Sequence, residues 1–170
     1  MKINLNYRWD KNAFLKANYY NLKYGEVALI KKIGGPISIV LCLATMFFIY
    51  IRGFKSQDVI PFILVTYFYA LRWPIYKLQV SRNFKKYSER DREISWEIGD
   101  EVLKGSVKGT SEGQFSWDLI KKVVKTKEGY LLHRYPMFHW FPISAFNNDL
   151  DIKNFEDLAR VKVKDFVNVK

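Results

Sequence analysis

The chain has 170 residues, of which 49% are hydrophobic and 26% are charged, and its formal net charge is +11. This length suits one small folded domain rather than two. A single cysteine excludes an intramolecular disulfide, and the two histidines form no Cys/His cluster for zinc. Common catalytic and phosphate-binding motifs are absent from the sequence, so we expect no enzymatic activity, no metal and no other cofactor.

Residues 1–32 are predicted to form a cytoplasmic segment beside a membrane. Residues 4–9 alternate apolar and polar side chains, which indicates a short strand. Asp10 is a suitable N-cap for a helix that runs roughly to Tyr24. The apolar residues of this helix are spread too widely for one stripe. We interpret it as a helix at the level of the lipid headgroups, with a lipid or partner dock as the alternative.

Two long apolar stretches follow, at residues 33–51 and 59–75. The first carries no charge, and the second carries only Arg72 near its end. A helix rises about 1.5 Å per residue, so each stretch is long enough to cross most or all of a ~30 Å hydrocarbon core. Residues 33–75 are therefore predicted to form a transmembrane hairpin, with Pro36 in the first turn of its first helix.

Small residues recur at every fourth position of the first stretch, at Gly34, Ser38 and Cys42. This spacing lets two helix backbones approach closely. We expect Thr66 and Ala70 of the second helix to face them, because the short connecting loop makes the helices antiparallel neighbours. Dimerisation through the same residues is the alternative.

Basic residues flank the two stretches, whereas the connecting loop at 52–58 carries few of them. The positive-inside rule then places both termini in the cytoplasm and the loop outside. Because the positive charge lies next to the spans, we expect the bilayer and its anionic headgroups, rather than nucleic acid, as the partner. The expected membrane-surface residues are Lys31, Lys32, Arg72, Lys77, Arg82, Lys85 and Lys86.

A basic connector at residues 76–92 is expected to continue the second helix. The period of the pattern then becomes two, since Ile94, Trp96 and Ile98 alternate with polar residues. Further strands are predicted near 102–107, 115–124, 130–135 and 137–143, and residues 152–166 have helical spacing. Residues 93–170 should therefore form an α+β cytoplasmic domain of antiparallel strands closed by one C-terminal helix.

Three segments of this domain carry a family resemblance: residues 115–120 (FSWDLI) with 122–124 (KVV), residues 128–132 (EGYLL), and residues 141–146 (FPISAF). Together with the two preceding spans, they resemble the YcxB-like bacterial membrane proteins, and residues 7–20 are similar to the start of that family. This chain departs from the family pattern at Ile143, where a basic residue is usual after the proline. The resemblance implies a cytoplasmic domain like the pleckstrin-homology (PH) fold and brings no catalytic residues with it.

The last predicted hairpin is apolar on both faces, with the sequence YPMFHWF at residues 135–141. A half-exposed sheet cannot bury both faces itself, so one face must meet the C-terminal helix, the membrane or a partner. The candidate partner-binding residues are Tyr135, Phe138, Trp140 and Phe141. His133 and His139 lie in the same hairpin and lack a third metal ligand at a motif spacing, so we interpret them as polar strand residues.

These features predict an integral membrane protein with a binding or regulatory module at the inner membrane face. Its expected ligand is a protein partner or a lipid headgroup. The alternative is a small subunit of a membrane transporter or enzyme complex. Two helices leave little room for a transport path, and no carboxylate within the spans marks one.

Overall fold

The computed structural model describes residues 2–25 and 28–169, without the side chains of residues 28–32 and of Ser111. It divides into two compact units, one made of Met1–Gly25 with Phe84–Lys170 and the other of Glu26–Asn83. The elements in chain order are β1 (Ile3–Arg8), α1 (Lys11–Tyr24), α2 (Ala28–Arg52), η1 (Ser56–Asp58), α3 (Val59–Thr66), η2 (Tyr67–Leu71), α4 (Arg72–Lys86), β2 (Glu93–Ile98), β3 (Val102–Val107), β4 (Ser111–Ser116), η3 (Trp117–Leu119), β5 (Lys122–Lys125), β6 (Gly129–Arg134), β7 (Met137–Pro142), η4 (Ile143–Ala145), α5 (Asp149–Lys162) and β8 (Asp165–Asn168).

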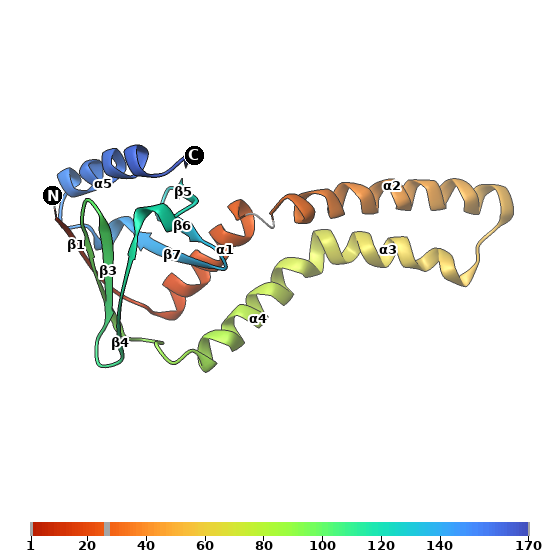
Figure 1. Cartoon of the computed structure of the whole chain (residues 1–170). Coiled ribbons are helices and arrows are strands. Elements are labelled where there is room, and N and C mark those ends of the chain that lie inside the picture. Colours follow the sequence, from red (N-terminus) through yellow and green to blue (C-terminus); the bar gives the residue numbers. More distant parts are fainter. Residues whose placement is uncertain (1, 26–27, 170) are drawn as a thin grey trace. The chain divides into compact units, whose positions relative to one another are not determined.

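The first unit contains a four-stranded antiparallel sheet in the order β1-β2-β3-β4 (Figure 1). The predicted alternation in β2 is confirmed, since Ile94, Trp96 and Ile98 are buried between less buried neighbours. β1 is its partner, with Ile3 opposite Ile98 and Leu5 opposite Trp96. The whole second unit is therefore an insertion between two paired strands of the first.

A second sheet has the order β7-β6-β5-β8, and β8 is parallel to β5 while the other pairs are antiparallel. The sequence indicates a helix to residue 166, but α5 ends at Lys162 and Phe166 lies in β8, opposite Val123. Helical spacing and a short strand both bury Phe166, so the spacing alone does not distinguish them.

Helix α1 belongs to the same unit as the sheets and is not a separate segment. Its predicted N-cap is confirmed, because the Asp10 carboxylate accepts a hydrogen bond of 2.7 Å from the backbone N–H of Ala13. Ala17 in the middle of the helix is fully buried, and Tyr20 stacks on Trp140 with the ring centroids 5.3 Å apart. Residues 2–25 thus form part of the β-rich domain, which differs from the predicted domain boundary at residue 93.

The second unit is a pair of helices that lie side by side, α2 and α3 (Figure 1). Two segments are long and apolar enough to cross a membrane: Ile33–Arg52 within this unit, and Ser56–Lys86, which begins in this unit and ends in the first. In the most apolar 18 residues of each segment, 6% are buried in the first segment and 0% in the second, whereas a core helix of a soluble protein is mostly buried. The first helix starts at Ala28, so Pro36 lies inside the helix and not in its first turn.

Gly34 and Gly35 of α2 lie against aromatic side chains of the segment that follows α3. A Cβ atom on Gly34 would lie 2.7 Å from the Phe68 ring, and one on Gly35 would lie 3.2 Å from the Tyr69 hydroxyl. Phe68 and Tyr69 belong to η2, a π-helical turn that inserts one extra residue into the ordinary helical repeat. The first helix is thus met by these aromatic rings, and its contact with the small residues at 66 and 70 stays a prediction.

Candidate functional site

A pocket of about 780 Å³ lies within the β-rich unit and is lined by residues of both sheets. Its walls come from β1, the start of α1, the turn after α4, and strands β2, β3, β4, β6 and β7. Small-molecule sites in proteins commonly occupy roughly 300–1,000 Å³. The pocket is therefore large enough for a small ligand, and we treat it as the candidate site.

Aromatic rings form a large part of the pocket wall. The His139 ring stacks on Phe115 with centroids 4.9 Å apart and meets the Trp96 ring edge-on at 5.0 Å. On another wall, Trp9 meets Phe14 edge-on at 5.9 Å. Aromatic pairs in such arrangements stabilise each other by about 0.5–1.5 kcal/mol beyond the area that they bury.

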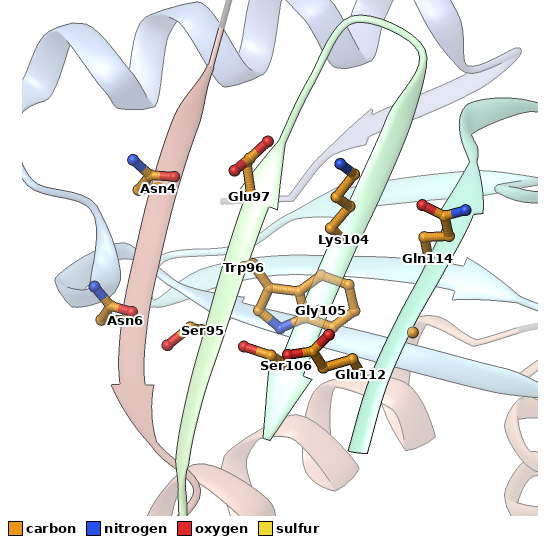
Figure 2. A pocket seen from close by; sticks show the side chains of 11 residues that line it. Asn4, Asn6, Ser95, Trp96, Glu97, Lys104, Gly105, Ser106, Glu112 and Gln114 are labelled. Atoms are coloured by element: carbon orange, nitrogen blue, oxygen red, sulfur yellow. The ribbon is translucent and has the colours of Figure 1, made fainter. Parts of the chain in front are cut away.

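Gly105 creates the space for the Trp96 ring. Gly105 of β3 lies opposite Trp96 on one side and Gly113 of β4 on the other. A Cβ atom at position 105 would lie 2.7 Å from the Trp96 ring, so only glycine lets this ring lie across the strand. Figure 2 shows Trp96 beside Gly105.

The outer face of the same sheet forms a shallower pocket of about 620 Å³ (Figure 2). Its side chains alternate with the buried ones and are mainly polar. Glu97, Glu112 and Lys104 bring both signs of charge to this face, so it favours no ligand of one sign. We interpret it as the solvated face of the sheet.

Three buried nitrogen atoms of residues that line the aromatic pocket lack hydrogen-bond partners among the described residues: the indole nitrogens of Trp9 and Trp96, and Nε2 of His139. Trp9 is 8% exposed, and its indole nitrogen has no acceptor among the described residues; the same holds for Nε2 of His139. Burial, with a smaller contribution from Arg134, lowers the pKa of His139 to about 4, so the ring is neutral at pH 7. An unpaired buried polar atom costs free energy, and these atoms have almost no accessible surface, so they are not contact points for a ligand in the pocket.

The tyrosines of the pocket are neutral hydroxyls that already donate hydrogen bonds. Tyr7 donates to the backbone carbonyl of Trp140 at 2.7 Å, and burial raises the pKa of Tyr7 above its usual range. Tyr87 donates to Glu89 at 3.1 Å, and burial, followed by the charge of Glu89, raises the pKa of Tyr87 to about 12. Neither hydroxyl provides an anionic nucleophile or base at neutral pH.

Three charged side chains line the pocket: Arg134, Glu89 and Glu112. The Arg134 guanidinium lies over the Phe115 ring, 4.8 Å from its centroid. No group of three His, Cys, Asp or Glu side chains gathers to hold a metal ion anywhere in the part of the chain that the structure describes. The charged groups of the pocket therefore offer hydrogen bonds of both kinds but no strong field of one sign.

The predicted partner-binding residues divide into two groups. Tyr135 is 74% exposed and Phe138 is half-buried. Trp140 and Phe141 are 2% and 0% exposed, so the prediction that they bind a partner is corrected: both are core residues. Tyr20 of α1 covers Trp140, and Phe141 packs against Phe155 of α5.

The predicted membrane-surface residues do not line the aromatic pocket. Lys77, Arg82, Lys85 and Lys86 are exposed on α4. Arg72 is half-buried, with its guanidinium 5.9 Å from the Phe68 ring centroid. The side chains of Lys31 and Lys32 lie outside the described residues.

The fold and the pocket define a β-rich domain that is interrupted by two helices of membrane-spanning length. Comparisons with protein-family models, with curated proteins and with solved structures found no match. Sequence reasoning missed the pocket because its walls join residues far apart in the chain, such as Trp9, Phe115 and His139. The only local signal was the density of aromatic residues in residues 135–141.

Proposed function

We propose that the protein is an integral membrane protein whose helical pair crosses the bilayer as a hairpin and holds a binding module at the inner membrane face. The observation that carries this proposal is the pairing of β1 with β2 across the helical insertion. Trp9, which precedes the insertion and α1, exchanges backbone hydrogen bonds of 2.8 and 2.9 Å with Arg92 and Asp91, which follow the insertion. Both ends of the insertion therefore belong to one folded domain, so the chain must cross a membrane an even number of times.

The side of the membrane follows from charge. Basic residues concentrate next to the two spans and are few in the connecting loop, which favours a cytoplasmic domain. Lys77, Arg82, Lys85 and Lys86 are exposed on α4, and in this proposal they contact anionic headgroups. Each such contact contributes about 1 kcal/mol near an anionic surface.

The domain itself is proposed to be PH-like and related to the YcxB-like proteins. A four-stranded antiparallel sheet, a second sheet and a helix after the last hairpin support this assignment. Two features of this domain were not predicted from the sequence. The helical pair is inserted within the domain, after α1, and the parallel strand β8 follows the last helix. The binding function is assigned to the aromatic pocket, because it combines a ligand-sized volume with several aromatic rings in its wall.

Single-cysteine labelling in intact cells tests the membrane topology. The only natural cysteine is removed by Cys42→Ser, and one new cysteine is introduced at an exposed loop position by Gln57→Cys or at an exposed domain position by Lys164→Cys. A membrane-impermeant maleimide should label position 57 in intact cells and position 164 only after permeabilisation. Equal labelling of both positions in intact cells would rule out the proposed hairpin.

A further inference from the structure

We propose that the aromatic pocket takes an extended peptide segment of a protein partner, which adds as a short strand along the free edge of β7 and presents an acidic side chain to Arg134. This inference rests on the proposed binding function, because it concerns the same pocket. It names the class of partner that the pocket takes, which the pocket volume alone does not specify.

The pocket runs along the outer edge of β7. This strand pairs with β6 on one side only and is the outermost strand of its sheet. Residues 136–140 all line the pocket, although successive side chains of a strand point to opposite faces of a sheet. His139 stacks on Phe115 of β4, whereas the next residue, Trp140, stacks on Tyr20 of α1. A pocket that reaches both faces of β7 in this way lies against its edge.

Hydrogen bonds on either side of the β6–β7 pair show which backbone groups point out of this edge. The His133 carbonyl accepts a hydrogen bond of 2.9 Å from the N–H of Lys121, which precedes β5. His133 therefore points toward β5, and Phe138, its partner in β7, points away from β6. The same direction follows for Trp140, two residues further on, whose carbonyl accepts the Tyr7 hydroxyl at 2.7 Å. Two independent observations thus agree on the outward-pointing residues.

The open part of the edge is centred on Phe138. Trp140 is 2% exposed and its carbonyl is paired, so the edge is closed at that end. Phe138 is half-buried and Met137 is exposed. Residues 2–25 and 28–169 supply no hydrogen-bond partner for the backbone N–H and C=O of Phe138. A residue of an added antiparallel strand pairs with both groups at once, which a ligand with a lone acceptor does not.

The walls beside this edge fit a single chain. Phe14 of α1 and Tyr87 lie on one side, with their ring centroids 5.7 Å apart, and Phe115 lies on the other. Apolar side chains of an extended segment would alternate between these two walls. A pocket of about 780 Å³ leaves room for one such segment, but not for the further strands that a second copy of this domain would bring with it.

Charge selects an acidic segment. Arg134 is the one cation among the described lining residues, and its guanidinium lies over the Phe115 ring without an ion pair to any described carboxylate. Glu89 already accepts the Tyr87 hydroxyl, and Glu112 lies on the polar outer face of the sheet (Figure 2). The net charge of +11 for the whole chain also favours an acidic partner.

Selection from a library of random short peptides on the full chain in nanodiscs tests the proposal. We expect the selected peptides to share an acidic residue among alternating apolar residues. The strongest binder is then synthesised with blocked ends, and its backbone N–H groups are methylated one at a time. Because a strand pairs through every second residue, methylation should weaken binding about tenfold at one position or at alternate positions, and little at the positions between.

Two variants at one position locate the contact on β7. Phe138→Ala and Phe138→Pro both remove the ring, but only proline removes the outward N–H, and neither removes a hydrogen bond to β6. The two variants should therefore have similar Tm values, and Phe138→Pro should bind the peptide about tenfold more weakly than Phe138→Ala does.

A second pair of variants tests the charge contact. Arg134→Gln should weaken binding of the acidic peptide about tenfold, and it should not weaken binding of the same peptide with glutamine in place of its acidic residue. Lys104→Gln is the matched control, because Lys104 is an exposed cation on the outer face of the sheet. This variant should leave binding of both peptides unchanged.

The proposal is overturned if the selection enriches no peptide, if methylation has the same effect at every position, or if the alanine and proline variants bind equally well. It is also overturned if the chain pairs with itself and Phe138→Pro abolishes this pairing, because the occupant is then a second copy. Cysteine labelling separates these failures from failure of the membrane proposal: with the labelling pattern of a hairpin, only the class of partner is wrong.

Discussion

At the scale of single residues, the pocket depends on aromatic side chains and on the absence of a Cβ atom at Gly105. Trp96 lies across Gly105 because β3 has no Cβ atom there, and the neighbouring Gly113 faces open space. His139 then stacks against Trp96 and Phe115. The sequence alone predicts the burial of Trp96 by its alternation but not the glycine beneath it, because Gly105 reads equally well as a turn or bulge residue.

The two glycines make a matched pair of substitutions. Gly105→Ala places a methyl group 2.7 Å from the Trp96 ring, so it should lower the free energy of unfolding by about 1–3 kcal/mol. Gly113→Ala meets nothing within 4 Å and should leave stability nearly unchanged. Denaturant unfolding of both variants checks this difference, and equal stabilities would show that Trp96 does not lie across Gly105.

At the scale of elements, local patterns predict the type of an element but not its partner. Helix α1 and strand β2 are where the sequence predicts them, whereas α5 ends at Lys162 and not at residue 166. The pairing of Ile3 with Ile98 is not predictable in this way, because an alternating hexapeptide carries no information about which edge it joins. The same limit explains why Trp140 looked available to a partner, since the covering Tyr20 comes from a helix that was predicted to lie elsewhere.

Helix α5 covers the core mainly through Phe155. Phe155 is fully buried. The centroid of its ring lies 4.8 Å from that of Tyr130, 5.6 Å from that of Phe146 and 5.8 Å from that of Phe141. Glu156 supplements this packing by accepting hydrogen bonds from Lys125 and Tyr130. Burial alone would raise the pKa of Glu156, but these hydrogen bonds outweigh it and the pKa is lowered.

Phe155→Ala should therefore lower the free energy of unfolding by about 3–5 kcal/mol, because it leaves a cavity among three rings. Val161→Ala in the same helix removes a side chain that is 82% exposed and should change stability little. Thermal unfolding of the two variants provides the comparison. A small effect of Phe155→Ala would mean that α5 does not cover the core as described.

At the scale of the whole molecule, the chain is one β-rich domain with a helical pair inserted near its start. The sequence instead predicts separate segments in succession along the chain, with the folded domain confined to residues 93–170. The difference arises because β1 and α1 contribute to the core from before the insertion: Leu5 and Ala17 are both fully buried. A domain of this size is stable only if it buries most of its apolar surface. Removing β1 and α1 should therefore lower its free energy of unfolding strongly.

The most direct test of this account is to remove the insertion. Residues 26–83 are replaced by a flexible Gly/Ser linker, and the product is compared with a fragment of residues 84–170 that lacks β1 and α1. Fractionation in alkaline carbonate and near-ultraviolet circular dichroism are measured for both and for the full chain. The account predicts that the full chain stays with the membrane, that the joined protein is soluble and folded, and that the fragment does not fold. A fragment as well folded and stable as the joined protein, or a full chain released by carbonate, would contradict it.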